Sequence, residues 1–271
     1  MGVVDLYGLG VRSRVETHGS RSDELTDAVR RAWSRCLSPA GGEVEGGRFT
    51  LELSEGGSAG SPREAAPGEL TALASADPDA LLQSLTQAVT AASIQARTGE
   101  LLMFHAGAVA EVRSGAALGF VAPGGTGKTT LARRLGASLG YLTDETVGVD
   151  ADGLVVPYPK PLSLRPAEFT GTKHETSPDE LGLRRPPARA RLARIVLLRR
   201  EEARSEPTFE ELSVVDAIVA LAPETSALSA LERPLHRLAA LLDSLPPVLE
   251  VRYAEADTVT DPLAALLGGS R

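Results

Sequence analysis

Residues 116–130 read AALGFVAPGGTGKTT, an apolar run that breaks into a glycine-rich loop ending in a lysine and two threonines. The apolar residues 117–122 predict a buried β-strand. After the loop, Leu131, Leu135 and Leu139 recur every four residues, which predicts an amphipathic helix. A strand, a glycine loop and a helix in this order are the context of a phosphate-binding P-loop, so the stretch predicts an α/β fold built around that loop.

The glycine loop carries residue types suited to binding a nucleotide. Gly124, Gly125 and Gly127 let the backbone curl so that its N–H groups point at phosphate oxygens. We expect Lys128 to reach the β- and γ-phosphates of ATP and Thr129 to hold Mg²⁺, at the positive end of the helix. The alternative is a turn followed by a lysine-bearing helix that binds no nucleotide. The predicted nucleotide-binding residues are Pro123, Gly124, Gly125, Thr126, Gly127, Lys128, Thr129 and Thr130.

Two acidic residues follow the predicted helix closely. Asp144 lies sixteen positions after Lys128, which leaves room for one helix and an immediate return strand ending in Asp144 and Glu145. This arrangement predicts that both carboxylates lie beside the γ-phosphate, where a carboxylate binds Mg²⁺, orients a hydroxyl or accepts its proton. We therefore predict Lys128 and Asp144 as catalytic and Thr129, Asp144 and Glu145 as metal ligands. The alternative is that the two acids only end a strand in solvent.

His105 stands in the apolar run LLMFHAGAV, on a predicted strand that forms a hairpin with the strand entering the loop. A histidine in such a run is often a hydrogen-bonded core residue. The sequence therefore leaves two interpretations of His105 open, a core residue and a residue of the catalytic site.

Composition excludes several classes of function. The chain has 271 residues, 42% of them hydrophobic, and a net charge of −8, which argues against a nucleic-acid binder because such proteins present a basic face. No run approaches the roughly 18 apolar residues that span a membrane, and the N-terminus does not have the pattern of a secretory signal. The single cysteine, Cys36, lies in a helical apolar pattern and indicates core packing in a reducing compartment. We expect a cytoplasmic protein without nucleic-acid or membrane partners.

The pattern of elements predicts two parts. Residues 1–76 are expected to form a smaller α+β region, with a linker rich in Gly, Ser and Pro at about 54–68. Residues 77–271 are expected to form the P-loop domain. Strands are expected at 3–15, 48–53, 101–112, 117–122, 140–150, 193–198 and 248–253, helices at 22–37, 77–99 and within 211–243, an extended stretch at 157–166 and a surface excursion at 172–190.

These motifs together resemble the C-terminal catalytic domain of the HPr kinase/phosphorylase family. The segments that carry the resemblance are Phe-His-Ala-Gly-Ala-Val at 104–109, APGGTGKTTLARRL at 122–135 and GYLTDETVGV at 140–149. By position, His105 matches the family's histidine, Lys128–Thr129 its Lys-Ser pair and Asp144–Glu145 its Asp-Asp pair. The segment PKPLSLR at 159–165 is similar to shorter HPr-kinase-like proteins, including those encoded beside lasso-peptide clusters. The resemblance covers about residues 100–200.

The resemblance implies a mixed-sheet core of the phosphoenolpyruvate-carboxykinase-like type, ATP and Mg²⁺ as cofactors, and a catalytic role for His105. Three departures qualify it. Ala122 replaces the first glycine of the loop, and Glu145 replaces the second aspartate. The family's phosphorylase signature has no counterpart, which leaves the kinase direction. The N-terminal part does not resemble the family's regulatory domain, so HPr itself is not the expected substrate.

The leading functional prediction is an ATP-dependent kinase that phosphorylates a hydroxyl, that of a Ser or Thr in a small protein or precursor peptide. Lys160 and Arg165, in the proline-rich stretch, are candidate contacts to phosphate or acceptor; the alternative is two solvated charges. Two other functions stay open, a nucleotide-binding regulatory or assembly protein without catalysis and a kinase of a small-molecule hydroxyl. The sequence also leaves the oligomeric state open, a homo-oligomer included.

Overall fold

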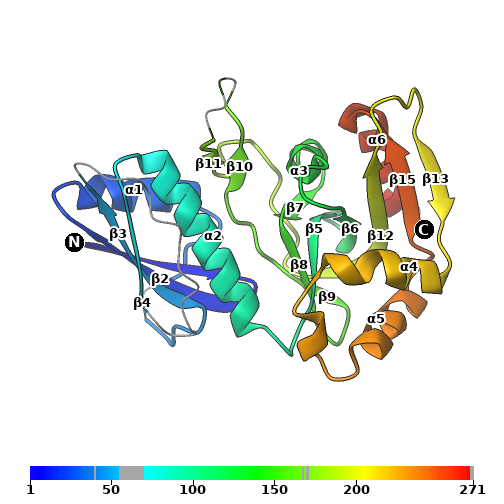
Figure 1. Ribbon diagram of the computed structural model, residues 1–271, viewed down its shortest axis with the longest axis horizontal. Coiled ribbons are helices and arrows are strands. Elements are labelled where there is room, and N and C mark those ends of the chain that lie inside the picture. Colours follow the sequence, from blue (N-terminus) through cyan, green and yellow to red (C-terminus); the bar gives the residue numbers. More distant parts are fainter. Residues whose placement is uncertain (40, 55–69, 167, 169–170, 269–271) are drawn as a thin grey trace. The chain divides into compact units, whose positions relative to one another are not determined.

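The computed structural model describes residues 1–39, 41–54, 70–166, 168 and 171–268 (Figure 1). The chain forms two compact units. The first consists of Met1–Arg97 and Pro159–Leu181, and the second of Thr98–Tyr158 and Gly182–Arg271. Most of the expected linker at 54–68 lies outside the described residues.

A four-stranded sheet forms the first unit. Its strands lie in the order β1-β2-β3-β4, with β1 antiparallel to β2 and the other neighbours parallel. The single strand expected at 3–15 is a hairpin, because Leu9 and Gly10 turn the chain with positive φ angles of 52° and 78°. The elements of this unit are β1 (Gly2–Gly8), β2 (Val11–His18), α1 (Ser22–Ala32), β3 (Gly47–Leu53), β4 (Leu70–Ser75), α2 (Pro78–Ala96), β10 (Leu162–Leu164) and β11 (His174–Thr176).

Helix α2 belongs to the first unit and not to the P-loop unit. It begins at Pro78, and the Asp77 carboxylate caps it by accepting a hydrogen bond from the Asp79 N–H at 3.0 Å. Its buried residues, among them Leu81 and Leu85, face β3 and β4, against which the helix packs. The division of the chain therefore differs from the expected boundary after residue 76, because the apolar face of α2 completes the core of the N-terminal sheet.

Residues 159–181 return to the first unit after the chain has entered the second. Strands β10 and β11 pair antiparallel, with Leu162 opposite Thr176. The Ser34 hydroxyl hydrogen-bonds Ser177 at 2.8 Å and donates to Asp179 at 2.6 Å. The surface excursion expected at 172–190 is thus partly wrong, since Ser177 is buried and hydrogen-bonded to Ser34, two residues after the end of α1.

A mixed nine-stranded sheet forms the second unit. The main strand order is β13-β15-β12-β6-β5-β8-β9, and β7 and β14 also pair with β5. Strands β6, β12 and β15 are parallel, whereas β5 is antiparallel to β6 and β8, so the expected mixed α/β class is confirmed. The elements are β5 (Leu102–Ala110), β6 (Ala116–Val121), α3 (Lys128–Gly136), β7 (Gly140–Thr143), β8 (Thr146–Val149), β9 (Leu154–Val156), β12 (Ala190–Arg200), β13 (Thr208–Glu211), α4 (Val214–Leu221), the 3₁₀ helices η1 (Ala222–Glu224) and η2 (Leu228–Ala230), β14 (Thr225–Ser226), α5 (Pro234–Asp243), β15 (Leu249–Tyr253) and α6 (Ala256–Gly268).

Helices cover the apolar strands of this sheet. Helices α4 and α5 pack on each other, as do α3 and α6, and Figure 1 shows the two pairs apart from one another. Leu221 of α4 and Leu238 of α5 join a core cluster with Phe104 of β5. Burial on both sides explains why β5 and β6 are almost continuously apolar. This core lies under β5 and β6, up to the point where the glycine loop begins.

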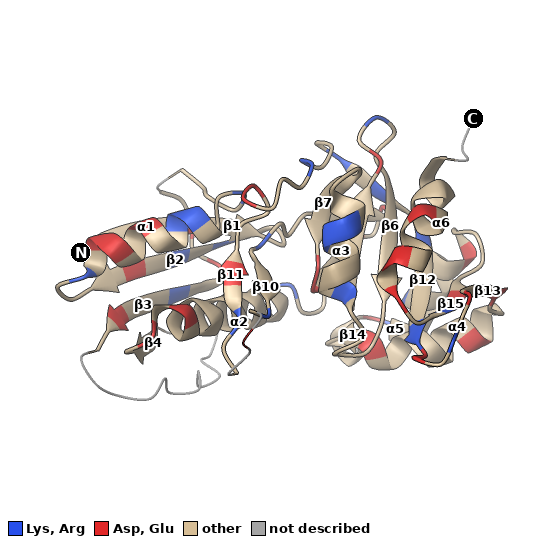
Figure 2. Ribbon diagram, turned by 90° about the horizontal axis from the view of Figure 1, so that it is seen from above, with Lys and Arg blue, Asp and Glu red and all other residues tan. Residues whose placement is uncertain are grey.

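Charged residues lie along α3 and α6 (Figure 2), and an ion pair joins Arg134 of α3 to Asp257 of α6. No helix in the described part of the chain is both long enough and apolar enough to cross a membrane.

Candidate functional site

The glycine-rich loop connects the end of β6 at Val121 to the start of α3 at Lys128. Gly125 and Gly127 adopt positive φ angles of 82° and 103°, which side chains other than glycine rarely adopt. The Thr126 hydroxyl donates to the Pro123 carbonyl at 2.8 Å, so the loop closes on itself. The Tyr253 hydroxyl at the end of β15 donates to the Thr126 carbonyl at 3.1 Å and anchors the loop to the sheet.

The open side of this loop fits an anion. A Cβ built on Gly124 or Gly125 meets no atom within 4 Å, so the space beside the backbone is clear. The first hydrogen bond of α3 runs from the Leu131 N–H to the Gly127 carbonyl, and no side chain caps the helix. The N–H groups of residues 128–130 therefore precede the helical ladder and are available to phosphate oxygens, next to the positive end of the helix dipole.

Lys128 is buried beneath the loop, with 7% of its surface exposed. Its ammonium donates to the carbonyls of Ala122 at 2.5 Å and Pro123 at 3.1 Å. Burial lowers the pKa of Lys128, and the negative charges of Glu224, Glu145 and Asp144 act in the opposite direction. Two loop carbonyls thus hold the ammonium of Lys128, and the negative charges of three carboxylates favour its protonated form.

The predicted carboxylate pair lies in the turn between β7 and β8. The Thr143 hydroxyl oxygen accepts hydrogen bonds from the N–H groups of Glu145 at 3.3 Å and Thr146 at 3.4 Å, which fixes the turn. Asp144 is buried, and the Tyr141 hydroxyl donates to its Oδ1 at 3.0 Å. Sequence reasoning missed Tyr141; its position three residues before Asp144, in an otherwise apolar strand, was the available signal.

Strand β5 brings the loop and the carboxylate turn together. Ala106 of β5 lies opposite Val121, the last residue of β6. On the other edge of β5, the N–H of Ala106 donates to the Glu145 carbonyl at 3.0 Å. One residue of β5 is therefore flanked by the start of the glycine loop and by the turn that carries Asp144 and Glu145.

His105 is half-buried and lies on the same stretch of β5, opposite Thr146. Burial lowers its pKa, and the charge of Lys128 lowers it further. The carboxylates of Glu145 and Glu224 and a hydrogen bond to the Glu145 backbone oppose this shift. The structure thus brings His105 into the electrostatic neighbourhood of Lys128 and Glu145; its catalytic role stays a prediction.

Glu224 is a carboxylate of this neighbourhood that sequence reasoning missed. It ends the 3₁₀ helix η1, directly before β14, and Thr225 of β14 lies opposite Phe104 of β5. Among the carboxylates acting on Lys128, Glu224 has the largest effect. Its sequence context, the Ala-Pro-Glu-Thr that follows α4, carries no motif, and only the long-range pairing of β14 with β5 reveals it.

Lys160 and Arg165 belong to the first unit, so their predicted contacts to phosphate or acceptor stay predictions. Lys160 is buried, and its ammonium donates to the Pro161 carbonyl at 3.0 Å. Arg165 is exposed.

The donor set suits Mg²⁺ bound together with a nucleotide. In the described ranges, no group of three or more His, Cys, Asp and Glu side chains is arranged to hold a metal. Mg²⁺ does not need such a group, since it is usually held by one or two carboxylates, waters and the phosphates of the substrate. Thr129, half-buried in the first turn of α3, and the pair Asp144 and Glu145 supply hard oxygen donors of the required kind.

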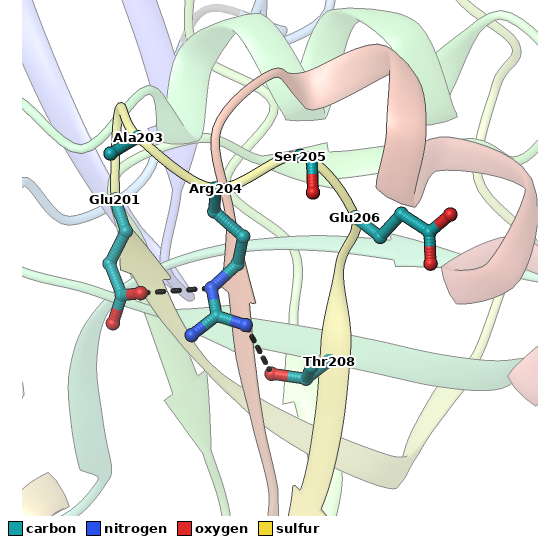
Figure 3. A pocket seen from close by; sticks show the side chains of 6 residues that line it. All are labelled: Glu201, Ala203, Arg204, Ser205, Glu206 and Thr208. Atoms are coloured by element: carbon teal, nitrogen blue, oxygen red, sulfur yellow. Dashed lines mark hydrogen bonds and ion pairs between the residues drawn. The ribbon is translucent and has the colours of Figure 1, made fainter.

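A pocket of about 440 Å³ lies elsewhere, in the connection between β12 and β13 (Figure 3). Its cation, Arg204, donates to Glu201 at 2.8 Å and to Thr208 at 3.4 Å. None of the predicted site residues lines this pocket, and its lining residues are Glu201, Ala203, Arg204, Ser205, Glu206 and Thr208.

Comparison with known proteins gives a limited result. No family model matches the chain, and no curated protein matches it. Among solved structures, the chain is similar to the Hpr(Ser) kinase/phosphatase from Coxiella burnetii, with 10% sequence identity and a TM-score of 0.33. The match covers 61% of this chain and 93% of that chain. A similarity of this size carries neither a fold nor an activity over to this chain, so the functional argument rests on the site itself.

Proposed function

We propose that this chain is an ATP-dependent kinase that transfers the γ-phosphate to a hydroxyl, a Ser or Thr of a small protein or precursor peptide. One observation carries the proposal: Lys128 begins α3 directly after an open glycine loop, and Ala106 of β5 is flanked by the strand that enters this loop and by the turn that carries the buried Asp144. Phosphoryl transfer requires mainly positioning and charge neutralisation, and this arrangement supplies both.

The residues of the loop bind the donor. The N–H groups of residues 128–130 take the phosphate oxygens, and Lys128 exchanges its bonds to the Ala122 and Pro123 carbonyls for bonds to the β- and γ-phosphates. Thr129, Asp144 and Glu145 are the proposed ligands of Mg²⁺. The ion would supply the positive charge that the phosphates require.

Asp144 acts on the acceptor. The acceptor oxygen forms a bond to the γ-phosphorus, the bond from that phosphorus to the ADP oxygen breaks, and the hydroxyl proton passes to the Asp144 carboxylate. The Tyr141 hydroxyl holds the Oδ1 atom of that carboxylate and orients the other oxygen. In this proposal Lys128 binds the donor, and Asp144 serves both the Mg²⁺ ion and the acceptor hydroxyl.

The choice of a peptide hydroxyl rests on the resemblance of the segment 159–165 to shorter HPr-kinase-like proteins, including those encoded beside lasso-peptide and other modified-peptide clusters. A small-molecule hydroxyl would use the same residues. A non-catalytic nucleotide-binding protein is the reading that Ala122 and Glu145 favour, since both depart from the family's pattern.

A transfer assay separates these functions. The full chain is incubated with Mg·ATP and a mixture of Ser- and Thr-containing peptides, or with hydroxyl metabolites, and products are identified by mass spectrometry. The matched variants are Asp144→Asn and Asp261→Asn, the latter an exposed aspartate on α6. Phosphopeptide formed by wild type and Asp261→Asn but not by Asp144→Asn supports the proposal. ATP binding without any transfer identifies a binding protein, and absence of ATP binding overturns the proposal.

A further inference from the structure

Glu224 directly precedes strand β14, and β14 pairs with β5 at the residues next to His105. Thr225 lies opposite Phe104 and Ser226 opposite Met103, so β14 continues along the edge of β5 that β6 leaves after Val121. Glu224 directly precedes Thr225 and His105 directly follows Phe104, so this pairing brings the backbone of Glu224 close to that of His105. Ala122, whose carbonyl binds Lys128, directly follows Val121, which lies opposite Ala106.

The backbone on either side of Glu224 is fixed, but its carboxylate is not engaged. The Thr225 hydroxyl donates to the Ala222 carbonyl at 2.6 Å and closes the 3₁₀ turn. Across the described part of the chain, no hydrogen bond and no ion pair within 4 Å holds the Glu224 carboxylate, which is half-buried. Its charge therefore acts on Lys128 and His105 through space.

The charges of this neighbourhood do not balance. In the described part of the chain, the charges that act on the Lys128 ammonium are those of three carboxylates, Glu224, Glu145 and Asp144. Asp144 and Glu145 directly precede β8, which pairs with one edge of β5, and Glu224 directly precedes β14, which pairs with the other edge. A triphosphate that enters the loop therefore meets an excess of negative charge, which is weakly screened in a partly buried site.

We propose that Glu224 is a third carboxylate of this site and that it makes nucleotide binding depend on Mg²⁺, by opposing a triphosphate that arrives without a divalent cation. The proposal rests on the proposed nucleotide-binding function and adds a specificity residue to it. Glu224 selects the Mg²⁺ complex over the free nucleotide, whereas the loop and Lys128 bind both forms. Its role is electrostatic, and no metal bond to Glu224 is required.

The test measures the dissociation constant of ATP with excess Mg²⁺ and with EDTA, by calorimetry on the full chain. The quantity compared is the ratio of the two constants in wild type, Glu224→Gln, Glu224→Asp and Glu210→Gln. Glu210 is an exposed residue of β13, which β15, β12 and β6 separate from β5. All variants are first checked for a cooperative thermal transition.

We expect Glu224→Gln to tighten binding of ATP in EDTA by about tenfold, the effect of removing one unit charge from a partly solvated site, and to reduce the ratio accordingly. Glu224→Asp keeps the charge, so its ratio should stay close to that of wild type, as should that of Glu210→Gln. An unchanged ratio in Glu224→Gln, or an equal loss of affinity in both conditions, overturns the role of Glu224. If wild type binds no ATP in either condition, the proposed function itself fails.

Discussion

The chain buries two lysines in two different settings, one in each unit. Lys128 lies under the glycine loop and donates to two loop carbonyls, and Lys160 lies in the proline-rich segment and donates to the Pro161 carbonyl. Lys128 begins a helix of nine residues. Lys160 precedes the short strand β10, and its positive charge lowers the pKa of the buried Cys36 thiol, against the larger effect of burial.

The difference teaches that a buried ammonium by itself does not mark a ligand site. Both lysines donate hydrogen bonds to backbone carbonyls, as is usual for buried polar groups. Only Lys128 also lies beside the N–H groups of a helix start and an open backbone surface, and these are groups that an anion satisfies. We therefore expect substitutions around Lys128 to change binding and turnover, and substitutions around Lys160 to change stability.

The largest expected effect concerns Asp144. Asp144→Asn keeps the size of the side chain but removes its capacity to accept a proton, so turnover should fall by about 10²–10⁴. Nucleotide affinity should change far less, since Lys128, the loop and the other two proposed Mg²⁺ ligands, Thr129 and Glu145, remain. Steady-state transfer rates and calorimetric titration on one preparation measure both quantities, with Asp261→Asn as the control. Turnover at the wild-type rate would mean that the catalytic base lies elsewhere.

Substitutions at two glycines of the loop should distinguish an effect on the stability of the protein from an effect on nucleotide affinity. Gly127→Ala forces a side chain into a φ of 103° and should destabilise the protein by about 1–3 kcal/mol. Gly124 has no positive φ and open space around it, so Gly124→Ala should leave stability within about 0.5 kcal/mol and lower nucleotide affinity by filling the phosphate space. Urea unfolding and calorimetry measure the pair. Equal stability losses would contradict this loop geometry.

A substitution at His105 tests whether this residue of β5 contributes to catalysis together with Lys128. If the half-buried ring supports the site, His105→Gln should lower turnover by up to about tenfold, the value of one hydrogen bond, with little change in melting temperature. A lower melting temperature with unchanged turnover per folded molecule would return His105 to the core.

Alkylation of Cys36 tests whether the surroundings of Lys160 are closed to solvent. Burial raises the pKa of its thiol to about 12, and the charge of Lys160 opposes this only in part. At pH 8 roughly one thiol in ten thousand is therefore ionised in the folded protein, and Cys36 should resist iodoacetamide. The same protein unfolded in urea should be alkylated readily. Rapid alkylation of the folded protein would show that this part of the first unit opens to solvent.

Local patterns predicted the elements of the second unit that carry the site. The apolar run before Pro123, the leucines after it and the short interval to Asp144 act within 30 residues, and each element forms as expected. The loop conformation follows from Gly125 and Gly127, which alone permit its positive φ angles. Nucleotide binding by these residues remains a prediction.

Long-range pairing could not be predicted. Glu224 reaches the site only because β14 pairs with β5, about 120 positions earlier in the sequence. The segment 159–181 joins the first unit through contacts such as Arg35 with Asp179 at 2.9 Å, and no local pattern encodes them. The hairpin at Leu9 and Gly10 was missed because leucine rarely adopts a positive φ.

Calorimetric titration of Mg·ATP into wild type, Lys128→Met and Lys160→Met tests the central claim most directly. Both substitutions replace a buried ammonium by an apolar chain of similar length. We predict that wild type and Lys160→Met bind with affinities within about twofold, and that Lys128→Met loses about 10- to 150-fold, the value of a charge-assisted phosphate contact of roughly 1.5–3 kcal/mol. Equal affinity of wild type and Lys128→Met would contradict the account, and a loss confined to Lys160→Met would place the phosphate contact in the proline-rich segment instead.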